Sequence, residues 1–287
     1  MSAEIVVMNK GAIALAADSA VTIGNGSRIY NTSNKLFMLS KYHPIGIMIY
    51  NNADFMGVPW EVIIKIYRKR LGDVKFDTIK EYCQHFIEFL NNEDLQLHTC
   101  EEEYVKDITL NYLFMLKDEI INTIKLKINE VERELTDEEQ IEISSNIINR
   151  HHESLNTYEN IVNITADTVD YIIRHYNQKT EDWVKQIIGS FLISNKDFGK
   201  ILTMPAQLFI KNFFGNMYSG IVIAGFGEKE IFPALISFKI QGIINKKVKY
   251  VLDNEKNISL ESNFDIIPFA QTDVVNTFIR GFDTNYI

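Results

Sequence analysis

Residues 11–22 read GAIALAADSAVT, a run of small and apolar side chains that ends at Asp18. A second apolar run, IVVM at residues 5–8, precedes it, and the intervening NKG at residues 9–11 is typical of a hairpin turn. Apolar residues at consecutive positions predict strands that are covered on both faces. This stretch therefore predicts stacked sheets with helices outside them.

Strand-like runs of the same kind occur towards both ends of the sequence, and helical periodicity fills the middle. The runs lie at residues 12–17, 36–39 and 45–50, and again at 220–225, 232–240, 247–252 and 264–269. In the middle, Thr136 and Glu139 have the spacing of a capping box that opens a helix. We therefore expect an α+β chain in which residues 1–59 and 216–287 form the core and residues 60–215 form a helical insertion.

The composition excludes several classes of protein. The 287 residues include 29 basic and 38 acidic ones, a net charge of −9, which argues against a nucleic-acid-binding surface. The two cysteines are too few for a disulfide framework, so we expect a reducing compartment and a cytoplasmic protein. No apolar run approaches the roughly 18 residues of a membrane span, and the start lacks the pattern of a signal peptide. We expect neither nucleic acid nor membrane as a partner.

Four residues have side chains of the types that bind zinc, in a C-x-H…H-x-C order: Cys83, His85, His98 and Cys100. Cys83 and His85 stand two positions apart in a helical pattern, and side chains at this spacing point to different faces. We therefore expect no metal site. The glycine pairs at residues 24–26 and 225–227 do not match a full phosphate-binding pattern, so no cofactor is expected.

The second residue of the chain, Ser2, carries a hydroxyl that could take part in catalysis. Ser2 is a small second residue, which is what methionine aminopeptidases need to remove Met1. Removal would leave a serine with a free α-amine, which titrates near ~7.7–8.0 and can act as general base for the serine's own hydroxyl. Ser2 is therefore a candidate nucleophile.

Two parts of the sequence resemble proteasome β-type subunits and the related bacterial peptidase of two-component ATP-dependent proteases. The resemblance rests on GAIALAADSAVT at residues 11–22, the Gly24-Asn25 turn, Lys35 before an apolar strand, PIGIMIYNNAD at 44–54, IVIAGFG at 221–227, PALI at 233–236 and Gly242. It implies the fold of the N-terminal nucleophile hydrolases, a four-layer αββα sandwich. The helical block at residues 60–215 would be a large insertion into it.

The resemblance also implies roles for individual residues. The family's N-terminal threonine falls on Ser2, its strand-end aspartate on Asp18 and its essential lysine on Lys35. The glycine whose backbone N–H forms the oxyanion hole falls on Asn51, or on Tyr50 or Asn52 if the alignment shifts by one residue. The family's serine-rich turn falls on residues 270–273, where Thr272 or Asp273 would serve the α-amine.

The function implied by this resemblance is amide hydrolysis, in particular by a threonine-peptidase-like protease that cuts peptide or protein substrates with Ser2. The alternative is a catalytically silent, proteasome-like scaffold whose helical block binds other proteins, since Asn51 departs from the family's glycine. A retained Met1 would block the amine and favour the scaffold. Because the family builds closed rings, the resemblance also implies a homo-oligomer and an ATPase or other protein partner.

Overall fold

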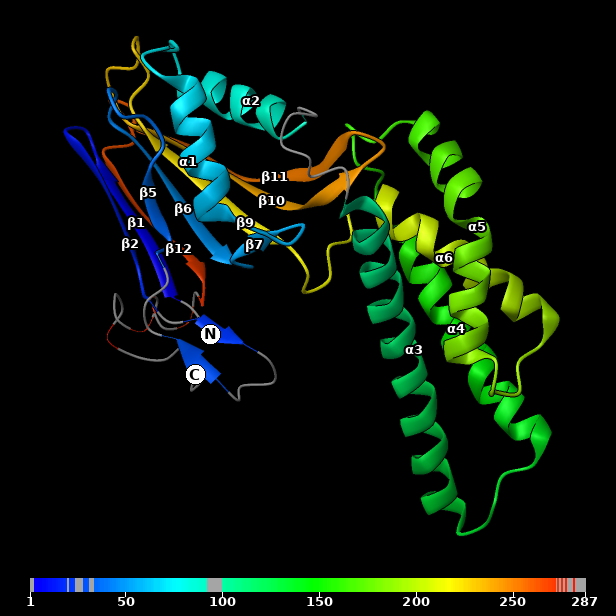
Figure 1. Cartoon of the computed structure of the whole chain (residues 1–287). Coiled ribbons are helices and arrows are strands. Elements are labelled where there is room, and N and C mark those ends of the chain that lie inside the picture. Colours follow the sequence, from blue (N-terminus) through cyan, green and yellow to red (C-terminus); the bar gives the residue numbers. More distant parts are fainter. Residues whose placement is uncertain are drawn as a thin grey trace. The chain divides into compact units, whose positions relative to one another are not determined.

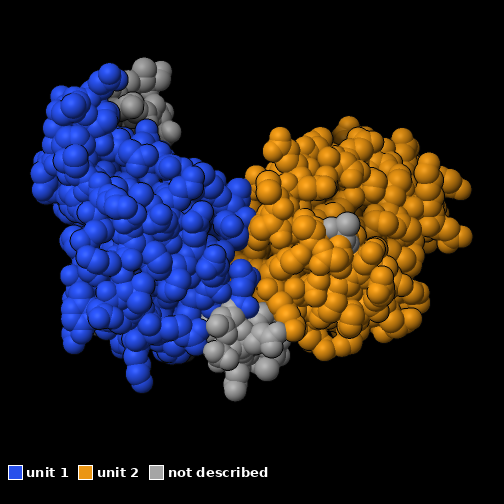
Figure 2. Space-filling view, turned by 90° about the horizontal axis from the view of Figure 1, so that it is seen from above, with its two compact units in different colours: residues 1–97, 216–242, 250–287 blue, residues 98–215, 243–249 orange. Residues whose placement is uncertain are grey.

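The computed structural model describes residues 3–19, 21–23, 28–30, 34–91, 100–271, 273, 275, 277 and 281. They form a mixed α+β structure with antiparallel sheets, in two compact units that Figure 2 shows in blue and orange. The first, here called the sheet unit, comprises residues 1–97, 216–242 and 250–287. The second, the helical unit, comprises residues 98–215 and 243–249.

A three-stranded antiparallel sheet with the order β12-β1-β2 joins an early and a late part of the chain (Figure 1). Its strands are β1 (Ala3–Asn9), β2 (Ala12–Ala17) and β12 (Phe264–Ala270). The central strand β1 pairs with β12 from Ala3 opposite Ala270 to Asn9 opposite Phe264. The predicted hairpin between the first two runs is therefore confirmed, and the late strand closes onto the first one.

A five-stranded sheet has the order β11-β10-β9-β6-β5. Its strands are β5 (Leu36–Met38), β6 (Ile45–Asn51), β9 (Ser219–Gly225), β10 (Ala234–Ile244) and β11 (Lys247–Asn257). The strands predicted from the apolar runs are thus present, although β10 and β11 extend beyond them. Two short hairpins, β3 (Val21–Ile23) with β4 (Arg28–Tyr30) and β7 (Asp54–Phe55) with β8 (Val58–Pro59), complete the strands.

The two sheets enclose a hydrophobic core, which holds the sheet unit together. Its buried members come from β1, β6, β9, β10 and β12 and from the loop after β11: Val6, Met8, Met48, Tyr50, Val222, Ala224, Leu235, Ile258, Ile267 and Phe269. Burial of apolar surface is the main favourable term in folding, so this cluster stabilises the packing of sheet on sheet.

Two helices cover the other face of the five-stranded sheet (Figure 1). They are α1 (Trp60–Leu71) and α2 (Ile79–Leu90), and α2 contacts β9. The ring of Tyr67 on α1 meets that of Phe86 on α2 edge to face, with centroids 5.0 Å apart. Because both helices pack in the sheet unit, the boundary between the two units lies near residue 98 and not at residue 60.

The outer face of the three-stranded sheet is exposed at β2 and at part of β1. Ala12, Ala14 and Ala16 alternate with half-buried neighbours along β2, and Val7 on β1 is 40% exposed. The prediction that the first runs are covered on both faces was therefore wrong for β2. A run of small residues tolerates water on one face, and this exposure shows that no described helix packs over these residues. The described part of the sheet unit thus has three layers: helices, five-stranded sheet and three-stranded sheet.

The helical unit is built from α3 (Glu101–Val131), α4 (Asp137–Thr157), α5 (Ala166–Ile188) and α6 (Asn195–Ile210). Each of these helices contacts at least two of the others. Their packing buries apolar side chains of all four, including Leu113, Leu116, Ile148, Ile188, Ile201 and Met204. None of the described helices is both long and apolar enough to cross a membrane.

Residues 243–249, the tip of the hairpin formed by β10 and β11, belong to the helical unit. Lys249 is completely buried there, and its Nζ donates hydrogen bonds to the carbonyl oxygens of Leu208, at 2.6 Å, and Phe213, at 2.5 Å. The same nitrogen lies 4.5 Å from the ring centroid of Phe214. Burial lowers the pKa of Lys249 well below its usual value. The hairpin tip is therefore a structural part of the helical unit.

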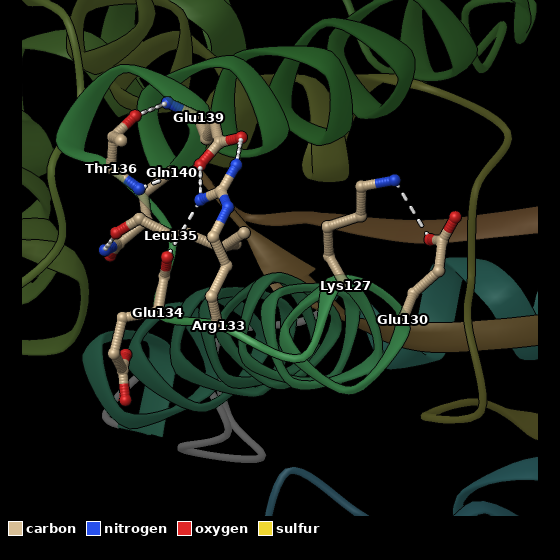
Figure 3. Close-up of polar contacts among 8 residues, drawn as sticks. All are labelled: Lys127, Glu130, Arg133, Glu134, Leu135, Thr136, Glu139 and Gln140. Carbon is tan, nitrogen blue, oxygen red and sulfur yellow. Dashed lines mark hydrogen bonds and ion pairs between the residues drawn. The ribbon is translucent and has the colours of Figure 1, made fainter.

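The turn between α3 and α4 is held by polar contacts (Figure 3). Thr136 is the N-cap of α4: its Oγ1 accepts from the Glu139 N–H at 3.3 Å, and Glu139 Oε2 accepts from the Thr136 N–H at 2.9 Å. The predicted capping box is confirmed. Arg133 forms a two-pronged ion pair with Glu139, and this hydrogen bonding lowers the pKa of Glu139 to about 2.

We predict that Thr136→Ala lowers the free energy of unfolding by about 1 kcal/mol, because an N–H at the start of α4 loses its acceptor. Thr136→Ser keeps a capping hydroxyl and serves as the matched control. Urea denaturation of the three proteins measures the difference. Equal stabilities of the alanine and serine variants would show that the cap contributes nothing.

Candidate functional site

A buried lysine is the centre of the candidate site. Lys35 lies just before β5, and its carbonyl oxygen accepts a hydrogen bond from the Ile49 N–H of β6 at 2.8 Å, which fixes its backbone on the five-stranded sheet. Its side chain is 8% exposed, and its Nζ lies within ion-pair distance of two carboxylates. A lysine at this depth needs such partners, since an unpaired buried charge is strongly unfavourable.

Asp18, directly after β2, is the first of these partners. Its Oδ1 lies 2.5 Å from Lys35 Nζ, and its Oδ2 accepts the Ala3 N–H at 3.2 Å. The Asp18 N–H in turn donates to the Ala3 carbonyl at 3.1 Å. The expected pairing of Asp18 with Lys35 is therefore present, and Asp18 also holds the backbone of the residue that follows Ser2.

Glu4 on β1 is the second partner, and the sequence analysis missed it. Its side chain is fully buried, and its Oε1 accepts a hydrogen bond from Lys35 Nζ at 3.1 Å. Burial raises the pKa of the Glu4 carboxyl, and the charge of Lys35 opposes this shift. A signal was available: Glu4 alternates with Val6 and Met8, so it belongs to the core-facing side of the strand.

Asn51 ends β6 with a backbone φ of 67°, in the left-handed region that glycine adopts readily and that asparagine tolerates better than most residues. Its side-chain Nδ2 donates to the carbonyl oxygens of Tyr218, at 2.7 Å, and Asn216, at 3.3 Å. These bonds hold the asparagine side chain against the chain at the start of β9. Asn51 therefore has a backbone conformation that glycine adopts readily.

A cavity of about 180 Å³ adjoins these residues. Its lining includes Lys35, Asn51, Asp54, Trp60 and Glu61. Trp60 stacks on Phe55 with ring centroids 4.8 Å apart, and its Nε1 donates to Ser219 Oγ at 2.8 Å. The aromatic wall of the cavity is therefore fixed, and the cavity offers polar and charged groups beside it.

The alternatives to Asn51 differ from it in their surroundings. Tyr50 is buried, its hydroxyl donates to Asp253 at 3.2 Å, and its ring lies where a side chain on Gly220 would clash. Asn52 is exposed and also lines the cavity. Asn51 alone of the three has the left-handed backbone.

The structure does not show the other expected site residues at the cavity. Ser2 and Thr272 lie outside the described residues. Asp273 is exposed, three residues beyond Ala270, which pairs with Ala3, and it does not belong to the described lining of the cavity. The structure therefore brings together Asp18, Lys35 and the unexpected Glu4, with Asn51 on the same cavity as Lys35.

The residues of zinc-binding type have other environments. Cys83 is buried in α2, where burial raises the pKa of its thiol, and His85 Nδ1 lies 3.0 Å from the Tyr67 hydroxyl. His98 lies outside the described residues. Within the described residues, no three side chains of metal-binding type lie close enough together to share an ion.

Comparison with known proteins does not assign a family. No protein-family model matches the chain, and no curated protein matches it either.

We predict that Lys35→Met lowers the free energy of unfolding by about 3 kcal/mol at neutral pH, because Asp18 loses its counter-charge and the buried Glu4 carboxyl loses its hydrogen-bond donor. Lys65→Met is the matched control, since Lys65 forms an exposed ion pair with Glu61 and should change stability by less than about 1 kcal/mol. Urea denaturation measures both. Equal losses of stability in the two variants would mean that the buried cluster stabilises the fold no more than an exposed ion pair does.

Proposed function

We propose that the chain is an amide hydrolase of the N-terminal nucleophile type, with Ser2 as its nucleophile after removal of Met1, and that its substrates are peptides or proteins. The observation that carries this proposal is the position of the buried Lys35 ammonium. It is paired with Asp18, and the other oxygen of Asp18 binds the backbone of Ala3, the neighbour of Ser2. A positive charge and an oriented carboxylate are thus anchored beside the start of the chain.

The proposed reaction has two steps. The Ser2 hydroxyl oxygen attacks the substrate carbonyl, the α-amine of Ser2 takes the hydroxyl proton and passes it to the leaving amine, and an ester forms at Ser2. Water, activated by the same amine, then hydrolyses the ester and regenerates the hydroxyl. Lys35 favours loss of the hydroxyl proton through its charge, and Asp18 orients Lys35. The Asn51 backbone N–H would receive the negative charge that develops on the carbonyl oxygen.

Two further features support the proposal. The order of layers, with α1 and α2 over a five-stranded sheet that packs on a three-stranded one, agrees with three layers of an αββα sandwich. The left-handed backbone of Asn51 is one that glycine adopts readily, which is compatible with its alignment to the glycine of proteasome-like proteins. The cavity beside Lys35 and Asn51 would receive a side chain of the substrate. A homo-oligomer and an ATPase partner, which the resemblance implies, stay predictions.

We predict that Ser2→Ala abolishes hydrolysis of fluorogenic peptide amides, with a loss of roughly 1,000-fold or more, because the nucleophile is removed. Ser2→Thr keeps the hydroxyl and the adjacent amine and should retain activity. Alanine, serine and threonine are all small, so each variant permits removal of Met1. Mass spectrometry of the purified proteins checks that removal.

The same measurements separate the peptidase from the scaffold. A protein that loses Met1 yet cleaves no peptide amide in a broad substrate panel, or whose Ser2→Ala variant is as active as the original, would contradict the peptidase. A retained Met1 together with an absence of hydrolysis would favour the silent scaffold.

A further inference from the structure

The two carboxyl groups that share Lys35 are not equivalent. Asp18 Oδ1 lies 2.5 Å from Lys35 Nζ, whereas Glu4 Oε1 lies 3.1 Å from it. The side chain of Asp18 is 37% exposed, but that of Glu4 is completely buried. Lys35 therefore lies nearer to the carboxyl group that reaches solvent than to the buried one.

We propose that Glu4 is a positioning residue that carries a proton in the working site: its neutral carboxyl accepts a hydrogen bond from Lys35, and Asp18 serves as the counter-ion of Lys35. This inference rests on the proposed function for its catalytic meaning. Its physical content, the protonated state of Glu4, can be measured without any activity.

The second oxygen of Glu4 also favours a protonated carboxyl group. Oε2 is buried from solvent and has no hydrogen-bond partner among the described residues. A negative charge on such an oxygen would lack the donors that a buried carboxylate needs, while a neutral carboxyl in the same place loses far less. Two ionised carboxylates on one ammonium would moreover repel each other.

The surroundings of Glu4 reinforce this conclusion. On the neighbouring strands of its sheet it stands opposite Ala17 and Phe269, neither of which is charged. The titratable groups that interact with it are Lys35, Asp18, the N-terminal amine and, from β6, Tyr50. Burial is the largest cause that raises the pKa of the Glu4 carboxyl, and the charge of Asp18 raises it further, while Lys35 and the N-terminal amine lower it.

The proton on Glu4 has a consequence for the proposed reaction. With Glu4 neutral, Lys35 and Asp18 form a neutral pair, and the ammonium end can stabilise negative charge that develops at the nucleophile. Loss of the Glu4 proton would add a negative charge beside Lys35. That charge would oppose the reaction and draw Lys35 Nζ from Asp18 towards Glu4. Activity should therefore fall as pH rises through the range in which Glu4 ionises.

The first arm of the test compares pH profiles of peptide hydrolysis for the original protein and Glu4→Gln. Glutamine has the shape of a protonated glutamate but cannot ionise, so the ratio of the variant's kcat to that of the original protein should rise with pH. Glu4→Leu lacks the acceptor for Lys35 and should lose roughly 100-fold in kcat, because the lysine is misplaced. A ratio that stays constant across the pH range would overturn the role in catalysis.

The second arm needs no hydrolysis. Because burial raises the native-state pKa of Glu4 above its unfolded value, its contribution to stability is fully present below the unfolded pKa and is lost as pH rises through the native one. The urea midpoint of Glu4→Gln should therefore rise relative to the original protein between weakly acidic and neutral pH. Glu88→Gln changes an exposed glutamate of α2 and is the matched control, which should show no such trend.

A third measurement guards against a variant that fails to fold. Carbon-13 NMR of the glutamate side chains in the original protein should show one carboxyl that titrates above the usual range of glutamate. Absence of such a carboxyl, with a urea-midpoint difference that does not change with pH, would refute the protonated Glu4. A protein without Met1 that shows the NMR signal but cleaves nothing would support the Glu4 inference and contradict only the peptidase proposal.

Discussion

The sheet unit depends on one lysine that the two sheets share. Lys35 belongs to the five-stranded sheet through its backbone, while Glu4 and Asp18 reach it from the three-stranded one. The apolar core between the sheets supplies most of the stabilisation, since a buried ion pair contributes little net free energy. The cluster instead fixes the register. A shift of β1 by one residue would turn Glu4 away and bring Ile5 to face the ammonium.

Much of this arrangement follows from the sequence, but by different routes. The strands were predictable because short apolar runs that are separated by turn residues are typical of β-strands. The pairing of Asp18 with Lys35 came only from a resemblance, because their spacing along the chain says nothing about proximity. Glu4 escaped notice because a charged residue near a chain end normally faces water. Its alternation with Val6 and Met8 was the decisive clue.

Other features lay beyond sequence reasoning for physical reasons. Helical periodicity identified α1 and α2, but it does not say which surface a helix packs on, so their place beside the sheet was not predicted. The exposure of β2 depends on whether another layer exists, which is a property of distant segments. The left-handed backbone of Asn51 depends on the hydrogen bonds of its side chain to residues near the start of β9. Such features arise only when the whole chain has folded.

The hairpin formed by β10 and β11 has a consequence for the order of events on the ribosome. The helices of residues 98–215 emerge before residues 243–249, yet these later residues complete their compact unit. Until Lys249 arrives, the carbonyls of Leu208 and Phe213 lack the donor that they have in the finished protein. The helical unit can therefore reach its finished packing only after residues 243–249 have been synthesised. Domains of a growing polypeptide commonly fold in order from the N-terminus, but here a segment that follows part of the sheet unit completes the helical unit.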